Sequence, residues 1–268
     1  MIAQDTPCRR CAYNLRGLSA DGRCPECGTS VARSLYGDAL RYSDPTFVAK
    51  LRLGVAITLW STLAAVPIEL AAQVSALFAL LVMANSLVSL AGAWLFTEPD
   101  PSGLGEERYG RARRLTRWSF VGITLVEIAL EGARRSGLLS NVSPRLAGAQ
   151  ELALVGAGIL AIIVSLLYFE RLAERVSDRA MSLRLGDRAR RIRGWLIVAL
   201  VSFVIAEGAR AAGAGRLILA ALVPALIFAL LTLVVLCVRF LMLTWSLRQA
   251  LANEERHARA SWSQPADD

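Results

Sequence analysis

The stretch Val48–Phe96 reads VAKLRLGVAITLWSTLAAVPIELAAQVSALFALLVMANSLVSLAGAWLF and is almost continuously apolar. From Leu53 to Phe96, after the last basic residue, the apolar run would be about 66 Å long as one straight helix, twice the roughly 30 Å hydrocarbon thickness of a bilayer. It must therefore fold back on itself, and Pro67, Glu69 and Gln73 interrupt it near the middle. The stretch predicts a helical hairpin that crosses a membrane twice and turns near these residues.

Similar apolar segments recur along the chain, in which 55% of the residues are hydrophobic. A crossing helix needs about 20 apolar residues. The predicted helices are Val48–Leu70, Val74–Phe96, Trp118–Leu130, Leu146–Phe169, Trp195–Ala206 and Leu217–Trp245. The third and fifth are short unless Glu131 and Glu207 are included. We therefore predict an all-α polytopic membrane protein, with a transmembrane domain over residues 46–250 built as three hairpins at 48–96, 111–169 and 188–245.

The distribution of arginines predicts the orientation of these helices. Segments Thr97–Arg117 and Glu170–Gly194 carry five and eight arginines, against three in Gly132–Arg145 and two in Gly208–Arg216. Because loops on the cytoplasmic side are enriched in Lys and Arg, the first two segments belong in the cytoplasm. This places both termini, including residues 1–45, on the cytoplasmic side of a bacterial inner membrane.

An internal repeat relates the second and third hairpins. The string RARRL before Trp118 recurs as RARRI before Trp195, and EGAR at Glu131 recurs at Glu207. Arginines followed by an aromatic ring at a helix entrance suit a bilayer with anionic headgroups. The predicted headgroup anchors are Arg111, Arg113, Arg114, Trp118, Arg188, Arg190, Arg191 and Trp195. A specific site for a phospholipid or a phosphorylated ligand is the alternative.

Two C-x-x-C pairs near the N-terminus are the strongest chemical signal in the chain. They consist of Cys8, Cys11, Cys24 and Cys27. Four thiolates at this spacing supply the ligands of one closed, structural Zn²⁺ site, and Pro25 and Gly28 favour the tight turn that such a site needs. Disulfides are the alternative, but they require an oxidising compartment, so the predicted cytoplasmic location favours zinc.

The residues around the cysteines also resemble a known pattern. Cys8–Leu18 reads CRRCAYNLRGL and Cys24–Gly28 reads CPECG. The pattern is similar to the short N-terminal zinc ribbon of uncharacterised planctomycete-type membrane proteins, C-x-x-C-x-Y-x-L-x-G followed by C-P-E-C-G. The resemblance covers residues 8–28 only, and Ala12 stands where glycine is more usual. It implies zinc and membrane attachment, and it implies no reaction.

Acidic residues inside or beside the predicted helices form a candidate intramembrane polar site. Carboxylates at membrane depth are costly and often mark ion or proton pathways. The candidate residues are Glu69, Glu127, Glu131, Glu207, Arg134 and Arg210. Because Arg134, Arg135 and Arg210 follow their glutamates by three or four residues, local ion pairs are the favoured interpretation, and a conduction or coupling site is the alternative.

Two segments outside the hairpins carry further predictions. In residues 170–185 the apolar residues and the arginines lie on separate stripes of a helix, which predicts an amphipathic helix at the inner membrane surface. Gly186 is predicted to end this helix, and Asp187 to cap the start of the next one. A solvated helical extension is the alternative. Residues 251–268 are predicted to be a flexible tail.

The chain carries no recognisable catalytic motif. Its single histidine, His257, lies in the predicted tail, so neither a Ser-His arrangement nor a histidine metal site is available among the helices. The prediction is a non-enzymatic membrane protein whose zinc module serves recognition, through a cytosolic protein partner, or stabilisation. One alternative is a transporter or channel that uses the glutamates. The other is a membrane-anchored ribbon that binds nucleic acid or protein; against nucleic acid, only Tyr13 offers an aromatic ring for base stacking.

Overall fold

The computed structural model describes residues 1–37, 39–72, 76–101, 106–137, 144–211 and 216–263. Within these residues it contains α-helices and one short 3-10 helix, and no strand. The elements are α1 Val31–Tyr36, η1 Leu40–Tyr42, α2 Pro45–Ala72, α3 Ala76–Phe96, α4 Glu106–Arg135, α5 Pro144–Ala173, α6 Arg179–Ala211 and α7 Arg216–Ser263. Residues 1–30, without helix, and α1 form a small N-terminal module, called the ribbon below.

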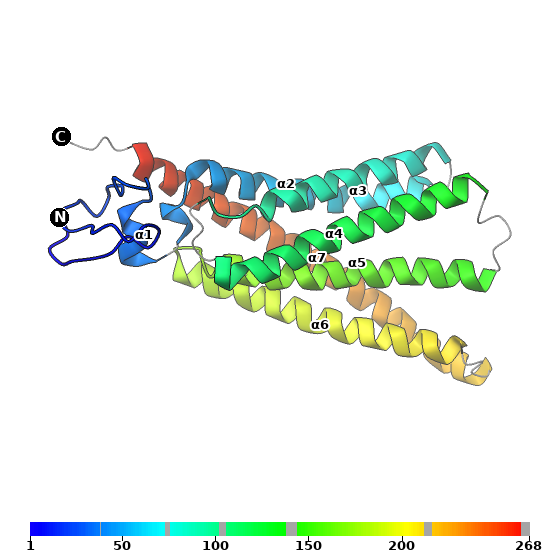
Figure 1. Ribbon diagram of the computed structural model, residues 1–268. Coiled ribbons are helices and arrows are strands. Elements are labelled where there is room, and N and C mark those ends of the chain that lie inside the picture. The colour runs from blue at the N-terminus through cyan, green and yellow to red at the C-terminus, as the bar shows by residue number, and fades with distance from the viewer. Residues whose placement is uncertain (38, 73–75, 102–105, 138–143, 212–215, 264–268) are drawn as a thin grey trace.

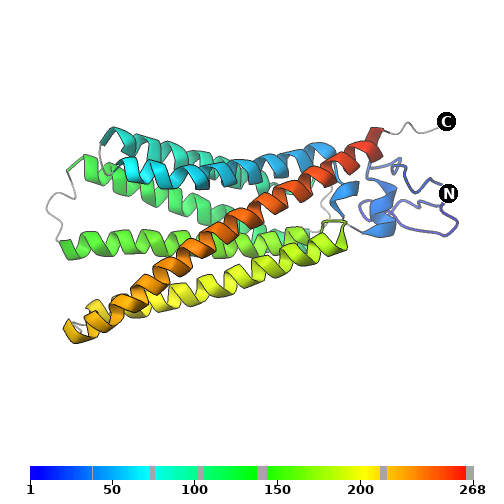
Figure 2. The ribbon, with the colours of Figure 1, turned by 180° about the vertical axis from the view of Figure 1, so that it is seen from behind.

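The six long helices form a closed ring. Each packs against the next in chain order from α2 to α7, and α7 packs back against α2. The helices run side by side between two ends, with α7 crossing behind at an angle (Figures 1 and 2). The ribbon and the C-terminal end of α7 lie at the same end of the molecule (Figure 1). The ring thus consists of three antiparallel hairpins, α2–α3, α4–α5 and α6–α7, with the ribbon covering one end.

Two glycines allow α2 and α3 to approach closely. A Cβ atom at Gly54 would lie 2.3 Å from the backbone nitrogen of Phe96 and 2.7 Å from the carbonyl oxygen of Gly92. A Cβ atom at Gly92 would lie 2.8 Å from Oγ1 of Thr58. Small residues at such contacts let helix backbones pack together in an apolar environment, where there is little hydrophobic force between helices. The first hairpin therefore depends on the absence of side chains at these two positions.

We expect Gly54→Ala to lower the free energy of unfolding by about 1–3 kcal/mol, because the new methyl group meets backbone atoms that cannot rotate away. The matched control is Gly122→Ala on α4, where a Cβ atom meets nothing within 4 Å. That change should be neutral or stabilising by up to about 1 kcal/mol, since alanine has the higher helix propensity. Thermal unfolding of both variants in the same detergent checks the difference. Equal losses of stability would contradict the close packing of α2 on α3.

Four phenylalanine side chains pack together inside the helical ring, toward the end that carries the ribbon. Phe96 lies 5.5 Å from Phe169 and 6.3 Å from Phe120, and Phe169 stacks on Phe240 at 6.2 Å, all measured between ring centroids. Phe96 and Phe169 are almost completely buried. These four side chains come from α3, α4, α5 and α7, so they hold four helices together at one level.

Three helical segments of the described structure are long and apolar enough to cross a membrane: Pro45–Ala72, Gly156–Ala173 and Val234–Ala260. Leu80–Phe96 is a shorter apolar helix. Large apolar side chains are also exposed on the other two helices, including Leu125 and Val126 on α4 and Val198 and Val201 on α6. Exposed apolar surface on this scale is typical of proteins that contact lipid. The composition and structure indicate a membrane protein.

The predicted amphipathic helix at 170–185 is wrong in its boundaries. α5 continues to Ala173, the chain turns over residues 174–178, and α6 runs without a break from Arg179 through Gly186. The physical reason is the cap at Asp178, whose carboxylate accepts hydrogen bonds from the backbone N–H groups of Ala180 and Met181 at 2.9 and 3.1 Å. These bonds satisfy the free donors at a helix start, so α6 begins at Arg179, seven residues before Gly186.

The predicted flexible tail at 251–268 is also wrong as far as Ser263, because α7 continues to that residue. Leu251 and Ala258 are fully buried, and Glu255 accepts a 2.6 Å hydrogen bond from Arg52 of α2. The sequence after Trp245 is polar, but its apolar residues keep the helical period, and its charges find partners on neighbouring elements. Residues 264–268 lie outside the described part of the chain.

Candidate functional site

The two cysteine pairs lie in matching backbone turns. Gly28 donates its N–H to the carbonyl oxygen of Cys24, as Ala12 does to Cys8, at 2.9 and 2.8 Å. The residue after each second cysteine has a positive φ, 67° at Gly28 and 62° at Ala12. Glycine adopts this conformation without strain, whereas alanine pays a steric cost there. The departure at Ala12 noted in the sequence therefore leaves the turn itself unchanged.

The four thiols lie close enough together to bind one metal ion. Their sulfur atoms are all within 4.8 Å of one another, with Cys8 to Cys27 at 3.6 Å and Cys11 to Cys24 at 3.5 Å. A tetrahedral ion with metal–sulfur bonds of about 2.3 Å separates its ligands by about 3.8 Å. A disulfide would bring two sulfurs to about 2.05 Å. All four cysteines are free, so the arrangement fits a metal site and not a pair of disulfides.

The surroundings of Cys27 and Cys11 shift the pKa values of these two thiols in opposite directions. Burial raises the pKa of Cys27, but hydrogen bonds with the hydroxyl and backbone of Thr29 and with Cys11 and Cys8 outweigh that effect and lower the pKa to about 6. A backbone hydrogen bond at Tyr13 lowers the pKa of Cys11, whereas desolvation and the neighbouring thiols together raise it to about 12. One thiolate thus suppresses the formation of the next. A cation is needed to hold four thiolates at these distances.

A buried charge cluster fastens the ribbon to the helical ring. Asp100, in the segment between α3 and α4, accepts hydrogen bonds from Arg33 of α1 at 2.5 Å and from Arg175, between α5 and α6, at 2.6 Å. Arg33 also donates to the hydroxyl of Ser43 at 2.8 Å. The side chains of all three charged residues are 3–6% exposed. The ribbon is therefore joined to two different interhelical segments through one carboxylate.

Backbone and ring contacts reinforce this junction. The N–H of Leu40 donates to the carbonyl oxygen of Arg175 at 2.9 Å. The guanidinium of Arg175 lies over the rings of Tyr109 and Phe47, 5.5 and 5.9 Å from their centroids. On the adjacent helix ends, Glu254 of α7 accepts from the hydroxyl of Ser177 at 2.7 Å. The junction thus reaches α2, α4 and α7 as well.

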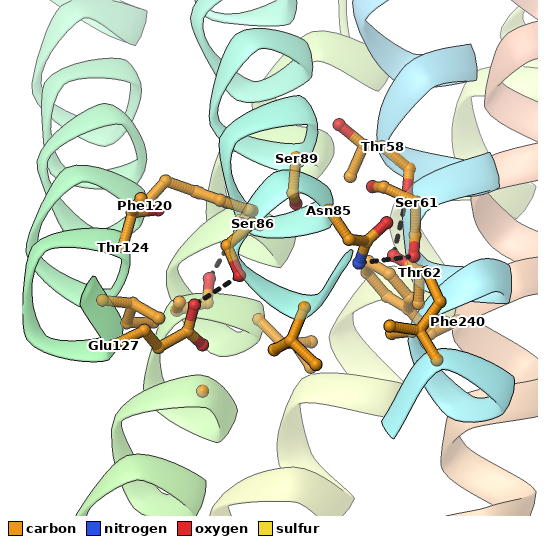
Figure 3. Close-up of a pocket in the computed structure, with 18 of the residues that line it drawn as sticks. Thr58, Ser61, Thr62, Asn85, Ser86, Ser89, Phe120, Thr124, Glu127 and Phe240 are labelled. Atoms are coloured by element: carbon orange, nitrogen blue, oxygen red, sulfur yellow. Dashed lines mark hydrogen bonds between the residues drawn. The ribbon is translucent and has the colours of Figure 1, made fainter. Parts of the chain in front are cut away.

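A separate cavity of about 290 Å³ lies within the ring of helices. Its walls come from α2, α3, α4, α5 and α7, and Figure 3 shows hydroxyl, amide and carboxylate groups among its lining residues. Glu127 accepts a hydrogen bond from Ser86, and Asn85 donates to the carbonyl oxygen of Ser61 at 3.2 Å. Ser86 and Asn85 of α3 thus face the opposite walls formed by α4 and α2.

The predicted intramembrane residues are only partly brought together. Glu69 and Glu127 both line the cavity, whereas Glu131, one turn beyond Glu127, does not. The side chains of four residues lie outside the described part of the structure: Arg134, Arg135, Glu207 and Arg210. The predicted pairs of Glu131 with Arg134 or Arg135 and of Glu207 with Arg210 remain predictions.

The predicted headgroup anchors occupy different environments. Trp118 and Trp195 are 65% and 50% exposed on the outside of the ring. Arg113 instead donates to the backbone carbonyl of Thr97, at 3.3 Å. Arg188 lies with Trp60 and Trp245 along an open, mainly apolar groove of about 430 Å³ between α2, α6 and α7. Arg111, Arg114, Arg190 and Arg191 are exposed.

Two groups of residues were missed by the reasoning from sequence. The first is the charge cluster of Arg33, Asp100 and Arg175. Asp100 lies 67 residues after Arg33 and 75 residues before Arg175, and no local sequence pattern marks the three as partners. The second is the set of polar residues that line the cavity. These do carry a signal, because polar residues recur at helical spacing within otherwise apolar segments: Thr58, Ser61, Thr62, Asn85, Ser86 and Ser89.

Comparisons of the chain with protein-family models, with curated proteins and with solved structures found no match.

Proposed function

We propose that the chain is a non-enzymatic, six-crossing protein of a bacterial inner membrane whose cytosolic zinc ribbon serves as an intramolecular clamp on the helix ends. The buried cluster of Arg33, Asp100 and Arg175 carries this proposal, since it joins the ribbon to the segments between α3 and α4 and between α5 and α6. Stabilisation of the bundle is favoured over recognition of a separate protein. The reason is that Arg33 of the ribbon is already buried in an ion pair with Asp100 of the same chain.

Six crossings are supported by the packing of the helices. At about 1.5 Å per residue, the 30 residues of α4 and the 33 residues of α6 give lengths of about 45 and 50 Å, more than the roughly 30 Å of a bilayer core. α4 packs against the apolar helix α5, and α6 packs against both α5 and α7. If α5 and α7 cross the membrane, α4 and α6 extend through the same layer.

Zinc is favoured over other metals by the ligand set. Four thiolates in a tetrahedral arrangement suit Zn²⁺, and a reducing cytoplasm keeps the thiols available for it. Cys8, Cys11, Cys24 and Cys27 would fill all four positions, which leaves no open position for a water molecule or a substrate. The site is therefore assigned a structural role and not a catalytic one.

Reporter fusions test the topology. Alkaline phosphatase, active only outside the cytoplasm, should be active when fused after Ser136, which follows three crossings. It should be inactive after Asp178 and after Trp262, where a cytoplasmic fluorescent reporter should be bright instead. If only α2, α5 and α7 cross, the fusion after Trp262 will be outside, and if α3 crosses with them, the fusion after Ser136 will be inside. Either pattern would overturn the six-crossing proposal.

A further inference from the structure

The cavity within the helical ring has a consistent chemical character. Its polar wall is built from hydroxyl groups of α2, α3, α4 and α5 together with Asn85 and Glu127. Figure 3 labels the hydroxyl residues of α2, α3 and α4 beside Asn85 and Glu127. Within the described residues, neither arginine nor lysine lines it. Buried polar side chains in an apolar bundle are costly unless they serve packing or a ligand. The concentration of such groups around one cavity is typical of a ligand site.

Three hydroxyl groups around the cavity already donate their hydrogens to the helix backbone. Thr58 donates to the carbonyl oxygen of Gly54 at 3.0 Å, Thr62 to that of Thr58 at 2.7 Å, and Ser165 to that of Ala161 at 2.8 Å. Each hydroxyl oxygen keeps a lone pair that can accept a further hydrogen bond. These three groups can therefore accept hydrogen bonds from a ligand while their own hydrogens stay bound to the helix backbone.

Glu127 gives the cavity its charge. Its carboxylate accepts one hydrogen bond, from the hydroxyl of Ser86, and among the described residues it has no basic partner. A carboxylate can accept about four hydrogen bonds, so most of its capacity is unused. Glu69 is a second acidic residue on the lining and lies at an exposed position of α2, nearer the end away from the ribbon. The combination of acceptors with an unpaired carboxylate selects a cation that donates hydrogen bonds.

The apolar end of the cavity sets the size and shape of that cation. Phe96, Phe120, Phe169 and Phe240 all belong to the lining and form the aromatic layer on the ribbon side. A cavity of roughly 150 Å³ is enough to bind benzene, so a volume of 290 Å³ admits a small organic molecule. A bare metal ion would find aromatic carbon where it needs further oxygen ligands.

We propose that this cavity binds a small organic primary ammonium ion, with its N–H groups on Glu127 and the hydroxyl oxygens and its apolar part against the phenylalanines. The ligand enters from the end opposite the ribbon, where Glu69 is exposed. Under the proposed topology that end faces away from the cytoplasm. The binding site uses the helical ring alone, so its test is independent of zinc content.

The test is calorimetric titration of the full-length protein in lipid nanodiscs with 2-phenylethylamine, which is protonated at neutral pH. Neutral 2-phenylethanol, of similar size and shape, is the control ligand. Saturable binding of the amine with much weaker binding of the alcohol is expected. No saturable binding of the amine at millimolar concentration would overturn the proposal. Equal affinity for the two compounds would also overturn it, because the carboxylate would then have no role.

Variants locate the site. Glu127→Gln should weaken binding of the amine by about tenfold to a hundredfold, because a charge-assisted hydrogen bond is lost. Thr62→Val keeps the carboxylate and the shape of the side chain but removes one acceptor, and it should weaken binding severalfold. The matched control is Glu131→Gln, one turn away and off the lining, which should bind as the wild type does. Binding unchanged by both cavity variants would overturn the assignment, and Thr62→Val provides this test even if Glu127→Gln fails to fold.

Discussion

Replacing Asp100 with alanine is expected to lower the free energy of unfolding by about 3–5 kcal/mol and to release the ribbon from the helical ring. The reason is that Asp100 is the carboxylate shared by Arg33 and Arg175, both of which are buried. Without it, two guanidinium groups lie side by side in a space with little access to water. Their mutual repulsion and lost hydrogen bonds are relieved only when the junction opens.

The matched control is Asp187→Ala on α6. Asp187 pairs with Arg190 at 2.8 Å, but the two side chains are 58% and 60% exposed, so this pair contributes about 0–1 kcal/mol. Thermal unfolding in detergent gives the stability of each variant, and trypsin cleavage near Arg33 and Arg41 reports release of the ribbon. If the Asp100 variant is as stable and as resistant as the Asp187 variant, the buried cluster does not hold the ribbon.

The second large effect is expected from Cys24→Ser combined with Cys27→Ser, which leaves two thiolates that cannot close a tetrahedral site. Binding of structural Zn²⁺ supplies about 10–16 kcal/mol in comparable small modules. The apolar core of the ribbon, by contrast, consists of Cys8, Leu15, Cys24 and Val31 with a few partly buried neighbours. So small a core cannot keep the module folded without the metal.

Hydrogen exchange read by mass spectrometry checks this expectation. In the wild type the N–H groups of Cys8, Leu15, Cys24 and Val31 are bonded to backbone carbonyls, so they should exchange slowly. In the double variant these amides should lose protection, whereas peptides from the middle of α2 and α5 should keep it. Retained protection in the ribbon of the variant would show that the ribbon folds without metal.

The features that could be predicted from sequence depend on local patterns. Metal ligands at C-x-x-C spacing must face one another because so few bonds separate them, and the turns at Ala12 and Gly28 are part of the same local pattern. The apolar helices follow from composition in the same way. By contrast, the end of α5 and the start of α6 depend on one cap at Asp178, which competes with an equally reasonable break at Gly186.

Features that join distant parts of the chain could not be predicted in this way. Nothing near Asp100 marks it as the partner of Arg33 and Arg175, since the pairing exists only once the helices are packed. The helical end of α7 depends similarly on Arg52, which lies 203 residues from its partner Glu255. The sequence predicts Glu127 as part of an intramembrane polar site, but its place beside Ser86 follows from how α3 packs against α4.

Metal analysis of the purified full-length protein, kept reduced throughout, tests the proposed zinc clamp most directly. The wild type and Cys237→Ser, which changes the one cysteine outside the ribbon, should each contain one zinc per chain, and Cys24→Ser with Cys27→Ser should contain none. Wild-type protein that holds no zinc, or that carries a disulfide among the four ribbon cysteines in intact cells, would contradict it.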